Sequence, residues 1–346
     1  MNAVITTINN PTSCVLKLAS KLKEHNGKLV SCGDKGSPSR GNDSDEKWQL
    51  DCDTEFLSLD DQNKLPYHIL KGLPEGHYSR KNVGYLRAME LGTKCVYETD
   101  DDNQPNEFWK PRESAVSASS VLPSEELRWV NAYNLFTSEH IWPRGLPLDK
   151  ISESALESIS KLPGQTYIAP IQQGLANVAP DVDAVWRLTQ GQEFHFPTEQ
   201  ESFLLTRGNW CPFNTQSTWW WPDAYPLLYV PSYCPFRMCD IWKSFVAQRC
   251  LWEFAEGVVF HSPEVDQLRN PHNLMRDFEG EIQGYLRNNE IAETLHNLPL
   301  REGLSNLKGN LRKCYEVLVK RGVFPSEELV LLDFWIKDCE RFDTFS

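Results

Sequence analysis

The chain has 346 residues and a formal net charge of −13, with 40% hydrophobic and 24% charged residues. This length and composition are those of a globular protein with one large or two modest domains, and they exclude an intrinsically disordered chain. Because nucleic-acid binding draws on clustered Lys and Arg, the acidic balance and the lack of a basic stripe argue against a nucleic-acid partner.

Cysteine spacing and hydropathy give two further expectations. The ten cysteines include no CxxC pair, which predicts reduced structural thiols rather than a zinc site. The first residues show no basic segment followed by an apolar one, and no run of eighteen apolar residues occurs. We therefore expect a cytoplasmic protein without a transmembrane segment.

The first part of the chain alternates between strand and helix patterns. A β-branched run at 2–8 predicts a strand, and Thr12 precedes apolar residues at helical spacing, so we expect it to cap a helix. A second strand is predicted at 28–32, and the polar stretch 36–53 predicts a surface insertion. This β-α-β start predicts an α/β fold with a parallel sheet.

Another helix and strand lead into an acidic triplet at 100–102. The helix is predicted at 79–91 and the strand at 95–99, and a weaker strand is predicted at 65–70. In open α/β sheets, ligands bind beyond the carboxyl ends of strands, and the triplet is expected there.

The rest of the chain is less regular in the middle and helical at the end. Three more strands and a helix are predicted, at 167–170, 184–188, 227–230 and 240–255. From about residue 273 we expect helices, the last of which begins at the Pro-Ser-Glu-Glu cap of 325–328.

The triplet consists of Asp100, Asp101 and Asp102, whose charges repel one another unless a cation or water compensates them. Hard divalent cations take oxygen ligands, and Mg²⁺ commonly combines one or two carboxylates with substrate phosphates. We therefore expect Asp100 and Asp102 to hold Mn²⁺ or Mg²⁺ against the diphosphate of a nucleotide-sugar, with Asp101 beside it. A solvated acidic turn is the alternative.

The stretch Arg80–Asn103, RKNVGYLRAMELGTKCVYETDDDN, resembles the signature of the STELLO-type (DUF288) glycosyltransferase family. Other segments agree, in order, over roughly residues 3–285: ITTINNPT, GDKGSP, IWPRGLPL, DVDAVWRLT, PFNTQST, DIWKSFVAQRCLWE and RNPHNLMRDFEGE. The triplet segment is also similar, more weakly, to the reversibly glycosylated polypeptides, which act as UDP-arabinopyranose mutases.

The resemblance implies a GT-A-like fold and transfer of a sugar from a nucleoside diphosphate, with UDP expected, to a carbohydrate or glycoconjugate acceptor. Residues 1–110 would form the nucleotide-sugar-binding half, 111–272 the acceptor-side half of the same domain, and 273–346 a helical extension. Two other readings stay open. One is a UDP-sugar mutase or self-glycosylating protein, and the other is a non-catalytic scaffold with this fold.

Polar residues after the first two strands are expected to bind the nucleotide. Thr6, Thr7 and Asn9 follow the first strand, where nucleotide-binding folds of this kind receive the base and ribose. Asp34 follows the second strand and could hydrogen-bond a uracil or a ribose hydroxyl. Each of the four also suits an ordinary strand end or turn.

Two cations precede the triplet strand. Arg80 and Lys81 open the helix at 79–91, where positive charge opposes the helix dipole. Because local stability does not explain them, we expect them to bind the donor's diphosphate, with solvated charges as the alternative.

Later residues supply candidates for a base and a third metal ligand. Asp240 would accept the acceptor hydroxyl's proton, although a helix cap would also explain it. Arg249, on the same helix, could reach the diphosphate or pair with Glu253. His272 is the expected third ligand, with His261 second, although single histidines are more often structural.

Overall fold

An eleven-stranded mixed sheet runs through the protein, whose computed structural model describes residues 1–37, 47–154, 161–191, 193–197, 200–269 and 273–342. The strand order is β3-β2-β1-β4-β12-β9-β13-β10-β6-β8, and β5 pairs with β13. Strands β1, β2, β3 and β4 are mutually parallel where they pair, whereas β12 is antiparallel to β4 and β9. The strands of this sheet are β1 (Asn2–Thr7), β2 (Lys28–Gly33), β3 (Asp53–Leu57), β4 (Val96–Thr99), β5 (Asn103–Pro105), β6 (Ala115–Val121), β8 (Lys161–Ile168), β9 (Ile171–Asn177), β10 (Phe203–Thr206), β12 (Ser217–Trp220) and β13 (Gly257–Gln267).

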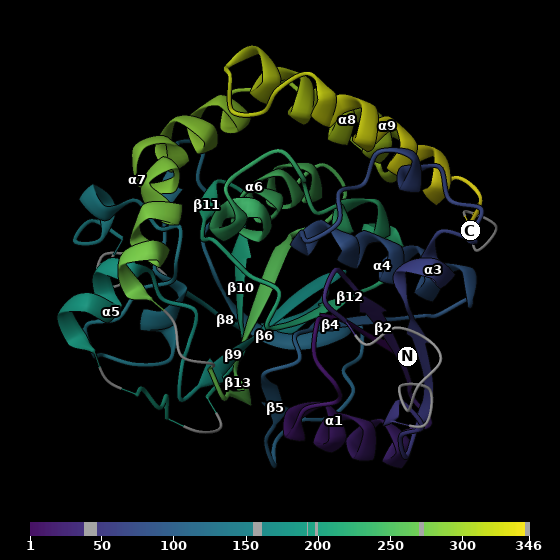
Figure 1. Cartoon of the computed structure of the whole chain (residues 1–346). Helices are drawn as coiled ribbons and strands as arrows, with labels where there is room; N and C mark the ends of the chain where they lie inside the picture. Colours follow the sequence, from purple (N-terminus) through teal and green to yellow (C-terminus); the bar gives the residue numbers. More distant parts are fainter. Residues whose placement is uncertain (38–46, 155–160, 192, 198–199, 270–272, 343–346) are drawn as a thin grey trace.

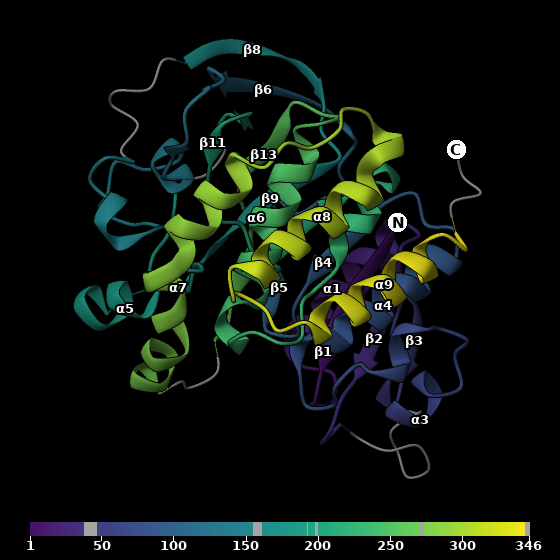
Figure 2. The ribbon, with the colours of Figure 1, turned by 90° about the horizontal axis from the view of Figure 1, so that it is seen from above.

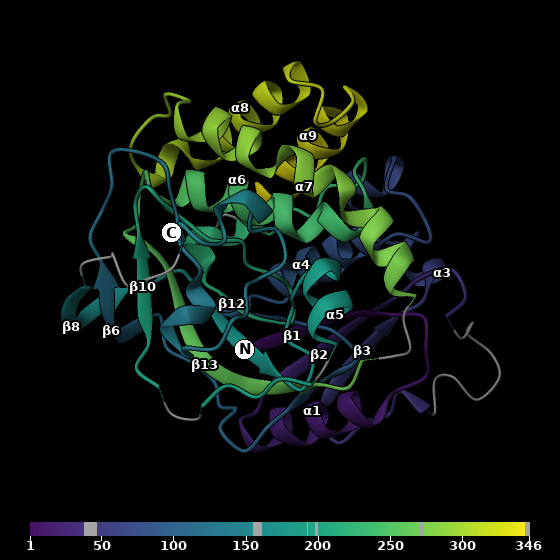
Figure 3. The same cartoon turned by 90° about the vertical axis from the view of Figure 1, so that its left-hand side faces the viewer.

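Helices cover both faces of this sheet. Helix α1 (Ser13–Glu24) lies on one face against β2 and β5, and α4 (Lys81–Glu90) and α6 (Cys239–Leu251) lie on the other (Figure 1). Helices α7 (Leu274–His296), α8 (Leu307–Lys320) and α9 (Glu327–Cys339) form an outer layer over α6 and α4 (Figures 1 and 3). Seen from above, β6 and β8 lie together at one edge of the molecule, with β7 (Arg128–Trp129) pairing β11 (Asn209–Trp210) in a small separate sheet (Figure 2).

Side chains alternate between the two faces of the sheet, as strand geometry requires. Val4 and Trp220 belong to the large core beneath α4, α6 and the C-terminal helices. Ile5, Tyr97 and Trp219 belong to a second core beneath α1. Each strand near the centre therefore contributes to two cores at once.

The predicted α/β, GT-A-like fold class is confirmed by this sheet and its helices. The first two strands, the helix at 79–91, the strand before the triplet, the helix from about 240 and the C-terminal helices all form. Thr12 caps α1, since its Oγ1 accepts a hydrogen bond from the Val15 amide. The division into 1–110, 111–272 and 273–346 stays a prediction.

Three of the predicted strands are wrong. Residues 65–70 form no strand, and Ile69–Lys71 is a 3-10 helix. Residues 184–188 lie in helix α5 (Ala184–Gln190), because the Asp183 carboxylate caps it by accepting from the Trp186 amide at 2.8 Å. Residues 227 and 228 are the end of a 3-10 helix, Pro222–Leu228, and 229–230 follow it. The two prolines of this helix cannot donate the backbone hydrogen bonds that a strand needs. The strand predicted at 167–170 overlaps the end of β8.

Within the described ranges, no helix combines the length and the apolar character that a bilayer crossing requires.

Gly84 lets α4 pack closely against the sheet. A Cβ at this position would lie 2.6 Å from Val4 Cγ1 of β1 and 3.1 Å from Cys32 Sγ of β2. The absence of a side chain therefore sets the distance between α4 and the two strands whose ends carry the predicted nucleotide-binding residues.

We predict that Gly84→Ala lowers the free energy of unfolding by about 1–3 kcal/mol through overpacking, although alanine favours a helix. Gly309→Ala in α8 is the matched control, because its Cβ would meet no atom within 4 Å, and it should raise stability by up to about 1 kcal/mol. Urea denaturation of the two variants checks this. Equal stabilisation by both would contradict the close packing.

Candidate functional site

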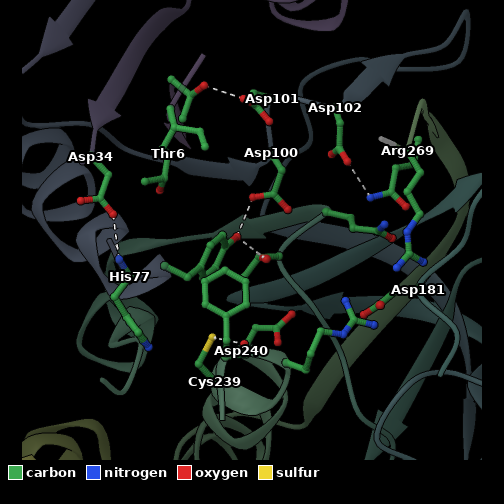
Figure 4. Close-up of a pocket in the computed structure, with 18 of the residues that line it drawn as sticks. Thr6, Asp34, His77, Asp100, Asp101, Asp102, Asp181, Cys239, Asp240 and Arg269 are labelled. Atoms are coloured by element: carbon green, nitrogen blue, oxygen red, sulfur yellow. Dashed lines mark hydrogen bonds between the residues drawn. The ribbon is translucent and has the colours of Figure 1, made fainter. Parts of the chain in front are cut away.

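A cavity of about 590 Å³ opens at the carboxyl ends of β1, β2 and β4. Because these strands are parallel, their ends reach the same edge of the sheet. Figure 4 shows Asp34 and His77 on one side of the cavity, the triplet along the next, Arg269 and Asp181 on the far side, and Asp240 at the start of α6. Eight of the predicted site residues line the cavity together: Thr6, Thr7, Asn9, Asp34, Asp100, Asp101, Asp102 and Asp240.

Asp100 is held by buried Lys81 and by half-buried Tyr78. Its Oδ1 accepts hydrogen bonds from Lys81 Nζ at 2.7 Å and from the Tyr78 hydroxyl at 2.6 Å. Lys81 also donates to the Thr99 carbonyl, which fixes the ammonium beneath the strand end. Burial raises the pKa of Asp100 above its usual value, although Lys81 and Tyr78 act against that shift.

Asp101 and Asp102 are held by different segments. Asp101 accepts from Thr7 Oγ1 at 2.5 Å and from Asn9 Nδ2 at 3.1 Å, and its carbonyl accepts from the Thr12 hydroxyl. Asp102 accepts from Gln267 Nε2 at 3.1 Å. The triplet therefore ties the loop after β1 to the end of β13.

Asp102 is the carboxylate whose charge is compensated least. Its pKa is raised to about 7 by burial and then by the charges of Asp100 and Asp101. Its Oδ1, like Oδ2 of Asp100, receives no hydrogen bond from a described residue. These two free oxygens are the donor type that a hard divalent cation prefers, so the pair fits such an ion.

The side of the cavity near Asp34 is built partly from backbone. Asp34 accepts from the amides of Lys35 and Gly76 at 2.7 Å and from that of His77 at 2.8 Å. Its carboxylate thus fixes the loop at 76–77 beside the end of β2. The buried hydroxyl of Thr6 has no hydrogen-bond partner within the described ranges, so a polar ligand group could satisfy it.

Asp240 forms a bidentate ion pair with Arg144, with N···O distances of 3.0 and 2.7 Å. Arg144 also grips Asp181 at 2.8 and 2.9 Å. Burial raises the pKa of Asp181, but the charge and hydrogen bonds of Arg144 outweigh burial and place it below its usual value. One guanidinium therefore orients two carboxylates at the start of α6.

Three of the predicted cations do not line the cavity. Lys81 lies behind Asp100, and Arg80 is buried against Gln62 Oε1 and the Leu73 carbonyl. Arg249 is also buried, because it pairs with Glu253 and donates to the carbonyls of Leu295 and Leu298. Because their guanidinium groups are occupied in this way outside the cavity, Arg80 and Arg249 do not contact a diphosphate bound there directly.

Neither predicted histidine is placed among the site residues. His272 lies outside the described residues. His261 is buried, and its ring nitrogens are 2.7 Å from Ser202 Oγ and 2.9 Å from Gln172 Oε1, so neither is free for a metal. Among the described residues, no group of three or more His, Cys, Asp or Glu side chains is arranged to hold a metal ion.

Four arginines that line one wall of the cavity were not predicted from the sequence. The residues concerned are Arg144, Arg187, Arg237 and Arg269. Arg144, Arg187 and Arg269 occur in the segments IWPRGLPL, DVDAVWRLT and RNPHNLMRDFEGE, which carry the family resemblance. The signal was present, but nothing in the sequence shows that these distant segments meet in one cavity.

Comparison with known proteins supports the resemblance. A sequence model of the STELLO glycosyltransferases matches residues 237–345, which include Arg237, Asp240 and Arg269 of the cavity. The chain is 28% identical to the protein named probable glycosyltransferase STELLO1 of Arabidopsis thaliana over 280 residues, covering 75% of this chain and 34% of that protein. It is 30% identical to probable glycosyltransferase STELLO2 of the same plant over 228 residues, covering 61% of this chain and 29% of that protein. The chain spans about a third of the length of these relatives, and the predicted resemblance to the STELLO-type family is confirmed.

We predict that Asp102→Asn stabilises the metal-free protein increasingly as pH rises. The pKa of Asp102 is higher in the folded protein than in the unfolded chain, so its favourable contribution to stability is complete below about pH 4 and is lost as pH rises through about 7. The advantage of the variant should grow by about 2–3 kcal/mol between pH 5 and pH 8. Urea unfolding with EDTA measures it, and exposed Asp149→Asn serves as control. A pH-independent difference would contradict the crowding of the triplet.

Proposed function

We propose that this relative of the STELLO glycosyltransferases is a metal-dependent glycosyltransferase. It would move a sugar from a nucleoside diphosphate, with UDP expected, to a carbohydrate or glycoconjugate acceptor. The observation that carries the proposal is the pair of oxygens, Asp100 Oδ2 and Asp102 Oδ1, that receive no hydrogen bond from a described residue. They lie at the carboxyl end of β4, inside a cavity large enough for such a donor.

Mn²⁺ or Mg²⁺ would be held by Asp100 and Asp102, and when bound it would neutralise charge on the leaving diphosphate. Two protein carboxylates suffice for such an ion when phosphates and water complete its shell. Lys81 and Tyr78 keep Asp100 aimed at the cavity, and Gln267 does the same for Asp102.

The nucleotide is proposed to lie toward Asp34, at the ends of β1 and β2. The unpaired hydroxyl of Thr6 and the neighbouring Thr7 and Asn9, which line the cavity, would hydrogen-bond its base or ribose. Asp34 contributes by holding the loop at 76–77, since three backbone amides already occupy its carboxylate.

Asp240 is proposed as the base that takes the acceptor hydroxyl's proton. Its support is its position in the cavity at the start of α6, opposite the triplet (Figure 4). Arg144 holds its carboxylate in one orientation.

The cytoplasmic location expected from the sequence stays a prediction. So do the alternatives of a UDP-sugar mutase or self-glycosylating protein and of a non-catalytic scaffold.

The first test is metal-dependent nucleotide binding. Isothermal titration of the native protein should give UDP binding that is at least tenfold tighter with MnCl₂ than with EDTA, and the double variant Asp100→Asn, Asp102→Asn should lose that difference. The matched control replaces Asp51 and Asp53, which have the same spacing and charge but have side chains about 70% exposed outside the cavity. Equal UDP affinity with MnCl₂ and with EDTA, or no UDP binding at all, would contradict the proposal.

The second test separates the two carboxylates that Arg144 holds. Asp240→Asn should lower the rate of UDP-glucose hydrolysis or transfer by about 10²–10⁴-fold, because proton transfer is lost, while UDP affinity changes less than about threefold. Asp181→Asn is the matched control and should keep most of the rate. Equal losses in both variants would mean that Asp240 only positions Arg144.

A further inference from the structure

Four arginines form the wall of the cavity farthest from Asp34, and three of them have carboxylate partners. Arg144 pairs with Asp181 and Asp240. Arg237 pairs with Glu281 at 2.6 Å, and Arg269 pairs with Asp277, also at 2.6 Å. These three guanidinium groups are explained by contacts within the protein.

Arg187 is the exception. No carboxylate of a described residue lies within ion-pair distance of its guanidinium, and its one hydrogen bond in the described part of the chain runs from Nη2 to the Pro180 carbonyl at 2.6 Å. Its Nε is buried and has no hydrogen-bond partner in the described residues. A buried donor left unsatisfied destabilises a fold, and the half-buried guanidinium of Arg187 also has no counter-ion among the described residues.

The surroundings of Arg187 add to this cost. Its pKa is lowered to about 10 by burial and then by the charge of Arg269, with Arg237 adding to the shift and Asp181 opposing it. Arg187 occupies the last turn of α5, where the helix dipole favours a cation only weakly. A structural role therefore does not account for the unpaired donor of Arg187 beside the guanidinium groups of Arg237 and Arg269.

The charges that act most strongly on Asp102 differ from those that act most strongly on Arg187. The charges that act most on Asp102 are those of Asp100 and Asp101, whereas those that act most on Arg187 are Arg269, Asp181 and Arg237. Figure 4 likewise shows the side chain of Arg269 on the Asp181 side of the cavity, across from Asp34. We therefore expect an anion that meets Arg187 to lie on the side of the cavity across from Asp34.

We propose that Arg187, with Arg237 and Arg269 beside it, binds an anionic group, a phosphate or a carboxylate, that the substrate carries on the side away from the nucleotide. The guanidinium fork matches the two oxygens of such a group, so the pairing is geometrically specific. The assignment of that substrate as a sugar donor or acceptor rests on the proposed function. Binding of the anion itself does not depend on the proposed function.

The first experiment uses inorganic phosphate without UDP or metal, so it is readable whether or not the protein binds nucleotides. Isothermal titration should show phosphate binding to the native protein that weakens about 10–100-fold in Arg187→Gln and less in Arg187→Lys, which keeps the charge but not the fork. Arg207→Gln is the control, because Arg207 is exposed and does not line the cavity. Equal phosphate affinity in the native protein and Arg187→Gln would overturn the proposal.

A measurement of melting temperature distinguishes anion binding by Arg187 from a purely structural role of this residue. Without ligand, Arg187→Gln should melt at the same temperature as the native protein or higher, and added phosphate should raise the melting temperature of the native protein only. A variant that melts lower, with the same phosphate response as the native protein, would mean that Arg187 serves the fold alone, and this too would overturn the proposal.

The second experiment identifies which substrate carries the anion. With Mn²⁺ present, a preference for UDP-glucuronic acid over UDP-glucose of at least tenfold, erased by Arg187→Gln, assigns it to the donor sugar. Equal affinity for the two, with phosphate binding to the UDP-loaded protein through Arg187, assigns it to the acceptor. If UDP instead displaces phosphate and Arg187→Gln weakens UDP itself tenfold, Arg187 serves the diphosphate and the proposal fails.

Discussion

Repulsion among three successive carboxylates at the end of β4 is the constraint around which this part of the molecule is arranged. Lys81 and Tyr78 reach Asp100 from below, and the loop after β1 reaches Asp101, so that two of the three charges are held by groups built into the fold. Asp102 is left with one amide from Gln267. The fold thus compensates most of the negative charge and leaves the remainder directed into a cavity.

The opposite wall of the same cavity carries arginines, of which Arg187 has no carboxylate partner among the described residues, and this wall does not neutralise the triplet. Arg144 binds Asp181 and Asp240 rather than the triplet, and Arg269 binds Asp277. Separated charges of opposite sign in one enclosed space create a strong field between them. Such a field suits a substrate that is anionic at more than one point and that is aligned along the cavity.

The first part of the fold was predicted well from the sequence because its helices and strands are indicated by patterns among neighbouring residues. The β-branched run of β1, the Thr12 cap and the apolar spacing of α4 are all read from neighbouring residues, and parallel β1, β2 and β4 then bring Thr6, Asp34 and the triplet to one edge. The strand predicted at 184–188 is wrong because the Asp183 side chain caps a helix there. The apolar pattern of these residues does not indicate this helix. The arginine wall could not be predicted either, because its members come from separate segments that meet only through the long-range pairing of the sheet.

The way in which Asp34 is held has a consequence for how such a site can change over generations. Its carboxylate is bound by main-chain amides of Lys35, Gly76 and His77, so the contact depends on backbone shape and not on which side chains the loop carries. Gly76 has a φ of +67°, and a Cβ there would meet no atom within 4 Å, so asparagine, which tolerates this conformation, could replace it at small cost. Among descendants of this gene, the loop can therefore drift in sequence while the aspartate that anchors it is retained.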